Sequence, residues 1–144
     1  MAATRQQVIE QARSYLGVRF RHQGRTREQG LDCFGLVIRV CHDLGLSAFE
    51  WMGYGRDPDP REVMRVGEEQ LHRIYWPEVQ AGDVVLMAWG SWPCHVAILA
   101  DKAHPFSLIH AYAGARKVCE IRMDAQLQQA ICGCFRLPNI QEAA

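Results

Sequence analysis

The stretch Leu31-Asp32-Cys33-Phe34-Gly35-Leu36-Val37 is the most informative part of the chain. Aspartate is a favoured helix N-cap, because its carboxylate accepts the free backbone N–H groups of the first turn. Asp32 therefore predicts a helix that begins at Cys33 and continues through an apolar run to about Leu44. Apolar residues occupy nearly every side of this segment, so we expect the helix to lie buried in the middle of the fold.

A cysteine at the first position of a helix is suited to act as a nucleophile. The positive end of the helix dipole favours thiolate over thiol, and the thiolate is the reactive form. The alternative is that Cys33 is a small apolar residue at a buried helix start. For a cysteine taken alone this alternative is favoured, so the decision depends on other parts of the chain.

Length and charge bound the class of protein. The 144 residues predict one domain over residues 1–144, with enough chain for a core of its own. The 16 basic residues (Lys and Arg) balance the 16 acidic ones, which argues against a nucleic-acid partner and against strong attraction to anionic membranes. Four arginines, Arg19, Arg21, Arg25 and Arg27, precede Cys33. A solvated loop is the preferred interpretation of this cluster, and a rim that attracts an acidic substrate is the alternative.

Nothing in the sequence predicts a targeting or membrane segment. The first eleven residues are polar and lack an apolar core, so we expect synthesis in the cytoplasm without a signal peptide. No run of about 18 apolar residues occurs, so membrane insertion is not expected. The six cysteines are then expected to stay reduced. No cofactor is expected.

Helix signals precede strand signals along the chain. Thr4 and Gln7 form a capping box for a helix over about 5–16, and Asp59-Pro60 starts another that reaches Ile74. Residues 18–31 and 46–58 are predicted loops, the second with exposed aromatic residues at Phe49, Trp51 and Tyr54. Apolar runs predict five strands, with a short helix before the last: 84–89, 95–100, 107–112, 117–121, helix 124–130 and 131–137.

This order predicts the fold class. Helices followed by strands are typical of an α+β domain, and short connections between strands favour antiparallel neighbours. We therefore expect the helix that begins at Cys33 to pack on an antiparallel sheet of about five strands.

Two of the six histidines, His95 and His110, lie inside predicted apolar strands. A cysteine nucleophile needs a base within hydrogen-bond reach and a third group that orients the base. If the two strands pair, both imidazoles can lie on the helix-facing side of the sheet and form a chain Cys33···His95···His110. The alternative is that each histidine merely bonds backbone groups. His22, in the loop before Cys33, could also reach the site.

Four motifs occur in the order found in the NlpC-type cell-wall cysteine peptidases, across about residues 8–137. Gly30–Val37 resembles the family's nucleophile segment, whose usual core is Asp-Cys-Ser-Gly. The other three are Gly82–Leu86, which resembles its Gly-Asp-Leu strand, His95–Ile98, which resembles its His-Val-Gly-Ile, and Ile109–Ala111, which resembles its Ile-His-Ala.

The resemblance implies a papain-like α+β fold and a Cys-His-His peptidase. Carried over to this sequence, Cys33 is the nucleophile, His95 the base and His110 its orienter. The implied substrate is the stem peptide of peptidoglycan, cut after D-γ-glutamyl at a diamino acid.

The sequence also departs from the family's pattern. Phe34 replaces the usual serine after the nucleophile, and Phe20-Arg21 stands where a Tyr-Arg pair is frequent. Phe20 lacks the hydroxyl near the oxyanion, which leaves His22 as a candidate substitute beside the backbone N–H of Cys33. The residues expected to contact substrate are Asp32, Phe20, His22 and Trp92. A wider aromatic set either lines a groove or belongs to the core: Trp51, Tyr54, Trp89 and Trp92.

The segment Phe20-Arg21-His22-Gln23-Gly24-Arg25 resembles the branch of the family found in phage tails and gene transfer agents. This implies a particle component with phage tail proteins as partners, delivered to the cell wall with the particle. Three alternatives stay open: a non-catalytic tail-assembly or binding protein on the same fold, an amidase or acyltransferase, and a metal-binding module. The last would use soft ligands of the strand region, namely Cys94, His95, His110, Cys119, Cys132 and Cys134.

Overall fold

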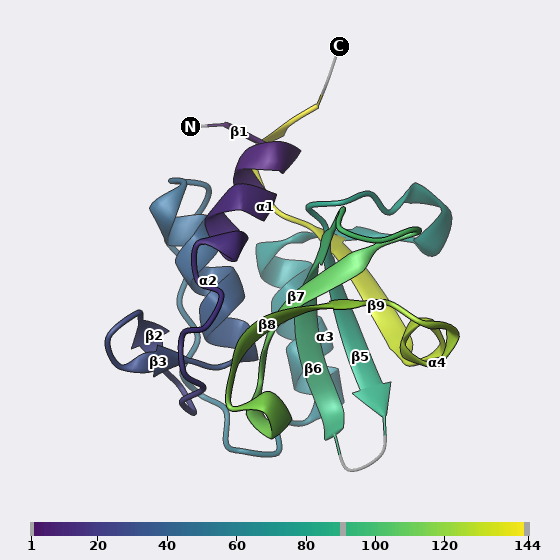
Figure 1. Cartoon of the computed structure of the whole chain (residues 1–144). Coiled ribbons are helices and arrows are strands. Elements are labelled where there is room, and N and C mark those ends of the chain that lie inside the picture. The colour runs from purple at the N-terminus through teal and green to yellow at the C-terminus, as the bar shows by residue number, and fades with distance from the viewer. Residues whose placement is uncertain (1, 90–91, 143–144) are drawn as a thin grey trace.

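The computed structural model describes residues 2–89 and 92–142, and of Trp89, Trp92 and Pro93 only the place in a strand. The fold is α+β, with the first three α-helices on one side of an antiparallel sheet and the short last α-helix on the other (Figure 1). This confirms the expected fold class. Every helix in the described ranges is too short or too polar to span a bilayer.

The helix starts agree with the capping signals in the sequence. Helix α1 (Arg5–Arg13) begins at the Thr4–Gln7 capping box, and α4 (Ala125–Gln129) at Asp124, which accepts from the N–H of Leu127 at 2.8 Å. Helix α2 spans Cys33–Asp43 and is buried, as expected. Helix α1 ends earlier than the expected residue 16, because the chain turns after Ser14.

The end of the third helix was predicted wrongly. Helix α3 (Pro60–Gln70) starts at Asp59 as expected, but it stops before Leu71 instead of reaching Ile74. Residues His72–Ile74 form strand β4, which pairs antiparallel with β9. Backbone pairing with a distant strand thus replaces the last helical turn.

The main sheet has six strands in the order β4-β9-β5-β6-β7-β8, one more than expected. Strand pairs β5–β6, β6–β7 and β7–β8 are antiparallel, as the short connections predicted. The other strand bounds are β5 (Val84–Trp89), β6 (Trp92–Ala100), β7 (Ser107–Tyr112), β8 (Lys117–Arg122) and β9 (Ile131–Arg136).

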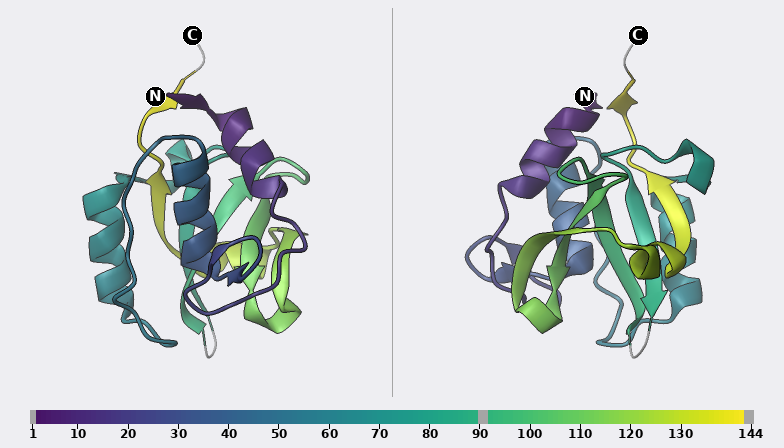
Figure 2. Two further views of the ribbon diagram at one scale, coloured as in Figure 1. Left: turned by 90° about the vertical axis from the view of Figure 1, so that its left-hand side faces the viewer. Right: turned by 45° about the vertical axis from the view of Figure 1, so that its right-hand side comes forward.

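Four two-residue strands and two 3₁₀ turns complete the chain. Strand β1 (Ala3–Thr4) pairs parallel with β10 (Ile140–Gln141), so these first and last strands lie side by side (Figure 2). Strands β2 (Arg25–Thr26) and β3 (Gly30–Leu31) form a hairpin just before α2. The 3₁₀ turns are η1 (Trp76–Glu78) and η2 (Ala113–Ala115).

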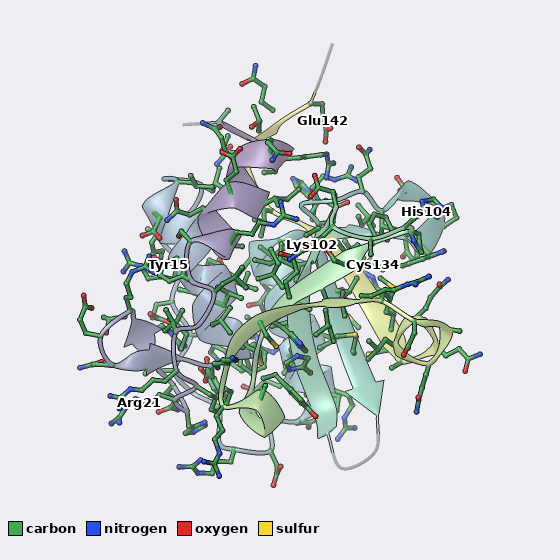
Figure 3. All side chains as sticks on the ribbon, in the orientation of Figure 1. Tyr15, Arg21, Lys102, His104, Cys134 and Glu142 are labelled. Carbon is green, nitrogen blue, oxygen red and sulfur yellow. The ribbon has the colours of Figure 1, made fainter. Side chains whose placement is uncertain are left out.

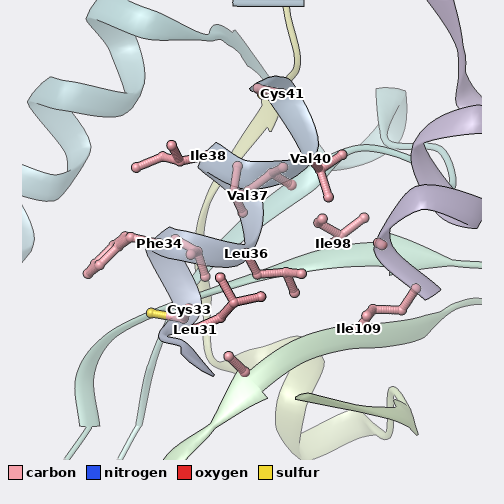
Figure 4. Close-up of a cluster of buried hydrophobic side chains, with 14 of the residues drawn as sticks. Leu31, Cys33, Phe34, Leu36, Val37, Ile38, Val40, Cys41, Ile98 and Ile109 are labelled. Carbon is pink, nitrogen blue, oxygen red and sulfur yellow. The ribbon is translucent and has the colours of Figure 1, made fainter. Parts of the chain in front are cut away.

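The core consists of two apolar clusters on the two faces of the sheet. The larger one contains the buried residues of α1, α2 and α3, and Figure 2 shows these three helices gathered on one side of the sheet. In Figure 4, Leu36, Val37 and Val40 of α2 face Ile98 and Ile109 of the sheet. The smaller cluster includes Val85, Met87, Ala97, Leu99 and Leu108. Helix α2 is therefore held rigidly, which fixes the position of Cys33.

Candidate active site

Asp32 caps the helix that carries Cys33. Its backbone is extended, and its Oδ1 accepts from the N–H of Gly35 at 2.7 Å. The cap satisfies one of the backbone donors that a helix start leaves without an intrahelical partner. This is the arrangement that the sequence predicted.

The carboxylate of Asp32 also gathers two loops around the helix start. Its Oδ2 accepts from the N–H of Gln23 and from the hydroxyl of Tyr54, each at 2.7 Å. The guanidinium of Arg25 donates to Oδ1 at 3.2 Å. Only 3 % of the surface of Asp32 is exposed, and its hydrogen bonds are made inside the protein. Asp32 therefore holds the two loops in place at the helix start. Its expected contact with substrate stays a prediction.

Arg25 is a structural residue, whereas the sequence suggested a solvated loop. Besides Asp32, its guanidinium donates to the Glu50 carboxylate, the Trp51 carbonyl and the Tyr54 hydroxyl at 2.8–2.9 Å. Its neighbours Arg19, Arg21 and Arg27 are exposed, and Figure 3 shows Arg21 beside the β2–β3 hairpin. The solvated-loop interpretation therefore holds for three of the four arginines.

Gly35 allows the loop to approach the helix closely. A Cβ built on Gly35 would lie 2.1 Å from the carbonyl oxygen of Gly24 and 2.9 Å from the Arg25 guanidinium. Real Cβ atoms do not approach backbone that closely, so only glycine fits here. The Gly in the Asp-Cys-x-Gly pattern thus has a packing reason.

Phe34 belongs to an aromatic cluster beside the helix start. Its ring lies 4.7 Å from that of Tyr54 and 5.3 Å from that of Trp51, centroid to centroid, both in edge-to-face contact. Tyr54, expected to be exposed, is 6 % exposed, and Phe49 and Trp51 are partly buried. Apolar packing against Phe34 overrides the loop character of residues 46–58, which explains why the prediction failed.

The sulfur of Cys33 lies against strand β6. The backbone N–H groups of Phe34 and Val96 lie close enough to the sulfur to favour its charged form, and the Cys94 thiol is close enough to act on it electrostatically. Val96 directly follows His95 in the chain. The fold therefore brings the start of α2 to the strand that carries His95, although Cys94 lies 61 positions after Cys33 in the sequence.

His95 and His110 are hydrogen-bonded to each other. Nε2 of His95 lies 2.7 Å from Nδ1 of His110, and the ring of Tyr112 stacks on His110 with centroids 5.4 Å apart. The two histidines are 0 % and 1 % exposed. The expectation that neighbouring strands bring the imidazoles together is confirmed.

The face on which they lie differs from the expectation. Ala97 lies two residues from His95, and Leu108 two residues from His110, so each shares a strand face with its histidine. Both Ala97 and Leu108 belong to the smaller cluster, away from α2. Strand alternation therefore puts the imidazoles on the face opposite the body of the helix. Cys33 therefore lies against the backbone of β6. The expected arrangement, in which Cys33 faces an imidazole on the helix side of the sheet, does not occur.

The β6–β7 ladder explains how the helix start reaches this place. The paired residues run from Ile98↔Ile109 to Ala100↔Ser107. His95 and His110 therefore lie beyond the last pair of this ladder. Tyr112 remains paired with Lys117 of β8, and β7 therefore diverges from β6 here. Because the two strands separate here, the backbone of β6 is open to the N-terminal start of α2.

Burial reverses the expected charge of the thiol. It raises the pKa of Cys33 to about 12, and the nearby carboxylate of Asp32 adds to the rise, while the N–H groups of Val96 and Phe34 oppose it. The positive end of a helix lowers a thiol pKa, but desolvation is the larger effect here. The resting sulfur is a neutral thiol, contrary to the prediction of a thiolate.

The imidazoles are neutral as well. Burial lowers the pKa of His95 to about 3, with the neighbouring His110 as a second cause, and burial lowers the pKa of His110 to about 4. A charged imidazole would lose its hydration at this site. At neutral pH the His95–His110 bond therefore joins two neutral rings.

A pocket of about 190 Å³ opens beside Cys33. Phe20 and His22, expected to contact substrate, both line it, and so do Asp32 and Tyr54. The side chain of Trp92, expected here too, lies outside the described residues, as does that of Trp89. The remaining lining residues are Phe34, Gly55, Arg56, Asp57, Pro58, Cys94 and Ala113.

Tyr54, one of the aromatic residues considered for a groove, does line the pocket, whereas sequence reasoning missed Cys94, Arg56 and Asp57 as pocket residues. They come from a loop and a strand far from Cys33, and no local pattern in the sequence marks them. Within residues 2–89 and 92–142, no three side chains of His, Cys, Asp or Glu converge as a metal site would require.

The family model of NlpC/P60 matches residues 17–132, a range that includes the helix start and both histidine strands. The chain belongs to the NlpC/P60 family. Comparison with curated protein sequences gives no match.

Solved NlpC/P60 structures have the same fold. A family protein from Bacillus cereus aligns with a TM-score of 0.69 and 19 % identity, over 96 % of this chain and 41 % of that one. The NlpC/P60 domain of the peptidoglycan hydrolase SagA gives 0.63 and 21 %, over 94 % and 100 %. The peptidoglycan hydrolase RipB from Mycobacterium tuberculosis gives 0.59 and 19 %, over 93 % and 64 %.

This chain spans a minor part of some of these relatives. It covers 41 % of the Bacillus cereus protein and 41 % of a similar protein from Staphylococcus aureus. At these identities the likeness concerns the fold, which is the papain-like NlpC/P60 arrangement.

Proposed function

We propose that the protein is a cysteine peptidase that cleaves amide bonds in the stem peptides of peptidoglycan. The observation that carries the proposal is the hydrogen-bonded pair His95–His110, in a strand whose Val96 N–H lies close to the Cys33 sulfur. Membership of the NlpC/P60 family supports it. The naming of SagA and RipB as peptidoglycan hydrolases supports the substrate class.

In this proposal His95 is the general base and His110 orients it. A neutral imidazole accepts a proton only at the ring nitrogen that carries none. With Nε2–H of His95 donating to Nδ1 of His110, the Nδ1 of His95 accepts the proton of Cys33. His110 thus fixes the tautomer that catalysis needs.

Thiolate and imidazolium form together as the sulfur attacks the amide carbon. Burial disfavours each charge alone, but their mutual attraction in a poorly hydrated site offsets part of that cost. The backbone N–H of Cys33, at the helix start, donates to the tetrahedral oxyanion. His22 is the candidate side-chain donor, because it lines the same pocket and Phe20 has no hydroxyl. His95 then protonates the leaving amine, and water hydrolyses the thioester.

The scissile bond in this proposal lies after D-γ-glutamyl, before a diamino acid. The motifs around Cys33, His95 and His110 support this choice, because they resemble those of the cell-wall peptidases with that specificity.

The test is digestion of purified peptidoglycan, with the released fragments weighed by mass spectrometry. Cys33→Ala should abolish release, and His95→Ala should reduce it nearly as far, because the base is lost. Cys41→Ala is the matched control, since Cys41 is a buried cysteine of the same helix without a place in the pocket. Release by Cys33→Ala at the rate of the unaltered protein would refute the proposal.

A non-catalytic binding protein on the same fold is the second candidate. Two observations favour it: the thiol of Cys33 is neutral at rest, and Phe20 lacks a hydroxyl. Such a protein would cosediment with peptidoglycan and release no fragments. The digestion therefore separates the two candidates.

We also propose that the protein reaches the cell wall as part of a phage-like particle. The resemblance of residues 20–25 to the tail and gene-transfer-agent branch supports this. Its detection in purified particles by mass spectrometry tests the idea, and its absence from particles that contain every other tail protein would contradict it.

A further inference from the structure

The pocket beside Cys33 has one side chain with a permanent positive charge. Of the charged groups in its lining, Asp32 is already bonded by Gln23, Arg25, Gly35 and Tyr54. Arg56 is therefore the cation that remains for a ligand.

Arg56 differs from most arginines of the protein in having no acidic partner. No salt bridge or side-chain hydrogen bond of Arg56 occurs among the described residues, even though Asp57 is its neighbour in the chain. Eight other arginines form ion pairs: Arg5, Arg13, Arg25, Arg39, Arg61, Arg65, Arg73 and Arg136. An exposed guanidinium at a pocket wall can bind a carboxylate through two parallel N–H donors.

The loop that carries Arg56 is anchored to the nucleophile. The hydroxyl of Tyr54, two residues earlier, bonds Asp32, and the side chain of Gln23 donates to the carbonyls of Met52 and Tyr54 at 2.9 and 2.7 Å. Gln23 has a φ of 60°, a conformation that costs a non-glycine residue energy. These contacts fix the backbone on which Arg56 stands relative to Cys33.

We propose that Arg56 binds a free carboxylate on the acyl side of the substrate, close to the amide that Cys33 attacks. This deepens the proposed function and rests on it. A γ-linked glutamyl residue presents such a group, since its α-carboxylate is separated from the scissile carbonyl by two methylene groups and the α-carbon. The pocket of about 190 Å³ is smaller than the roughly 300–1,000 Å³ that hold drug-sized ligands, so it suits one residue.

The proposal predicts a substrate preference. Amidation of the α-carboxylate, which gives an isoglutaminyl residue, removes the negative charge and leaves the scissile bond unchanged. A charge-assisted bidentate contact is lost, so kcat/KM should fall about 10- to 100-fold for the amidated substrate.

The experiment crosses enzyme variants with two synthetic peptides, L-Ala-γ-D-Glu-diaminopimelate and the same peptide with the glutamyl α-carboxamide. Arg56→Gln should lose about 10- to 100-fold in kcat/KM on the carboxylate peptide and change little on the amide, so that discrimination disappears. Arg56→Lys should keep part of the preference, because a lysine supplies the charge without the fork. Arg61→Gln is the control, because the side chain of Arg61 is 93 % exposed and lies outside the pocket.

A second control variant is expected to improve binding of the carboxylate peptide instead of weakening it. Asp57 lines the same pocket and repels a carboxylate, so Asp57→Asn should lower KM for the carboxylate peptide about twofold and leave the amide peptide unchanged.

Each outcome decides the proposal. Equal kcat/KM of the unaltered protein on both peptides, or discrimination that persists in Arg56→Gln, overturns the role of Arg56 and leaves the peptidase assignment standing. Cleavage of neither peptide, together with no release from whole peptidoglycan, overturns the proposed function and this inference with it.

Discussion

The two halves of the candidate site are built by different forces. On the helix side, the carboxylate of Asp32 is bonded by four donors, among them Arg25 and Tyr54. On the strand side, His95 and His110 share one hydrogen bond within apolar surroundings and are almost completely buried. The nucleophile is thus fixed by a redundant polar network, and the base by packing.

Because of this difference, the two halves of the site should be sensitive to different perturbations. A network with several donors loses little when one donor is removed, but much when the shared acceptor is removed. A buried pair of neutral imidazoles is sensitive to protonation, because burial penalises the charged form. The helix side should therefore respond to substitution, and the strand side to pH.

The largest expected effect is the loss of stability on acidification. The pKa values of His95 and His110 in the folded protein, about 3 and 4, lie below the 6.5 of a free imidazole. Between about pH 6.5 and pH 4 the unfolded chain therefore binds protons that the folded chain does not bind. The free energy of unfolding should fall by up to about 1.4 kcal/mol per pH unit for each histidine as pH is lowered through this window.

Urea unfolding at a series of pH values measures this slope. His110→Asn should reduce it by about half, because one of the two groups no longer titrates. A flat free energy of unfolding between pH 6.5 and pH 4.5 would show that the imidazoles are not buried neutral groups.

The next effect concerns the shared acceptor. Asp32→Ala should destabilise the protein by about 3–5 kcal/mol, because four donors lose their shared acceptor and Arg25 keeps only the more exposed Glu50 as an ionic partner. Asp59→Ala is the matched control, since Asp59 caps α3 at the surface and its loss should cost much less. Equal losses of unfolding free energy in the two variants would mean that the network adds nothing to the cap.

Gly35 tests the close contact between helix and loop. Alanine is favoured over glycine inside a helix by about 1 kcal/mol, but its Cβ would collide with the carbonyl of Gly24. Gly35→Ala should therefore lower the free energy of unfolding by about 1–3 kcal/mol, a typical result of overpacking. Gly53→Ala, with its nearest atom at 3.5 Å, should be nearly neutral, and a stabilised Gly35→Ala protein would contradict the packing argument.

The smallest effect is expected from one donor of the network. Tyr54→Phe removes the hydroxyl that donates to Asp32 and accepts from Arg25, but keeps the ring against Phe34. Three donors to Asp32 remain, so the loss of unfolding free energy should be about 1 kcal/mol. A loss as large as that of Asp32→Ala would show that the network is not redundant.

Local features of the fold were readable in the sequence. The caps at Thr4, Asp32 and Asp59 and the short helix after Asp124 were predicted correctly, because each depends on contacts within a few residues. The strands 84–89 and 107–112 were also predicted with their bounds, since their apolar runs end at turn residues. The pairing of His95 with His110 followed from strand alternation and a short connection.

Features that depend on distant segments were not readable. Strand β4 exists because β9 offers a partner, and nothing within residues 71–74 signals that strand. Tyr54 is buried because its ring packs against Phe34 and its hydroxyl donates to Asp32. Helix propensity and loop composition carry no information about such partners.

Sequence alone determined where the reactive groups stand along the chain: a thiol at a helix start and two imidazoles on neighbouring strands. Tertiary structure decided their charge and approach. The thiol of Cys33 is neutral because burial outweighs the helix dipole, and its sulfur meets the backbone of β6 because that strand diverges from β7 there. Hydrogen bonds of a cap are local, whereas desolvation depends on every atom that surrounds a group, and the folded chain supplies those atoms.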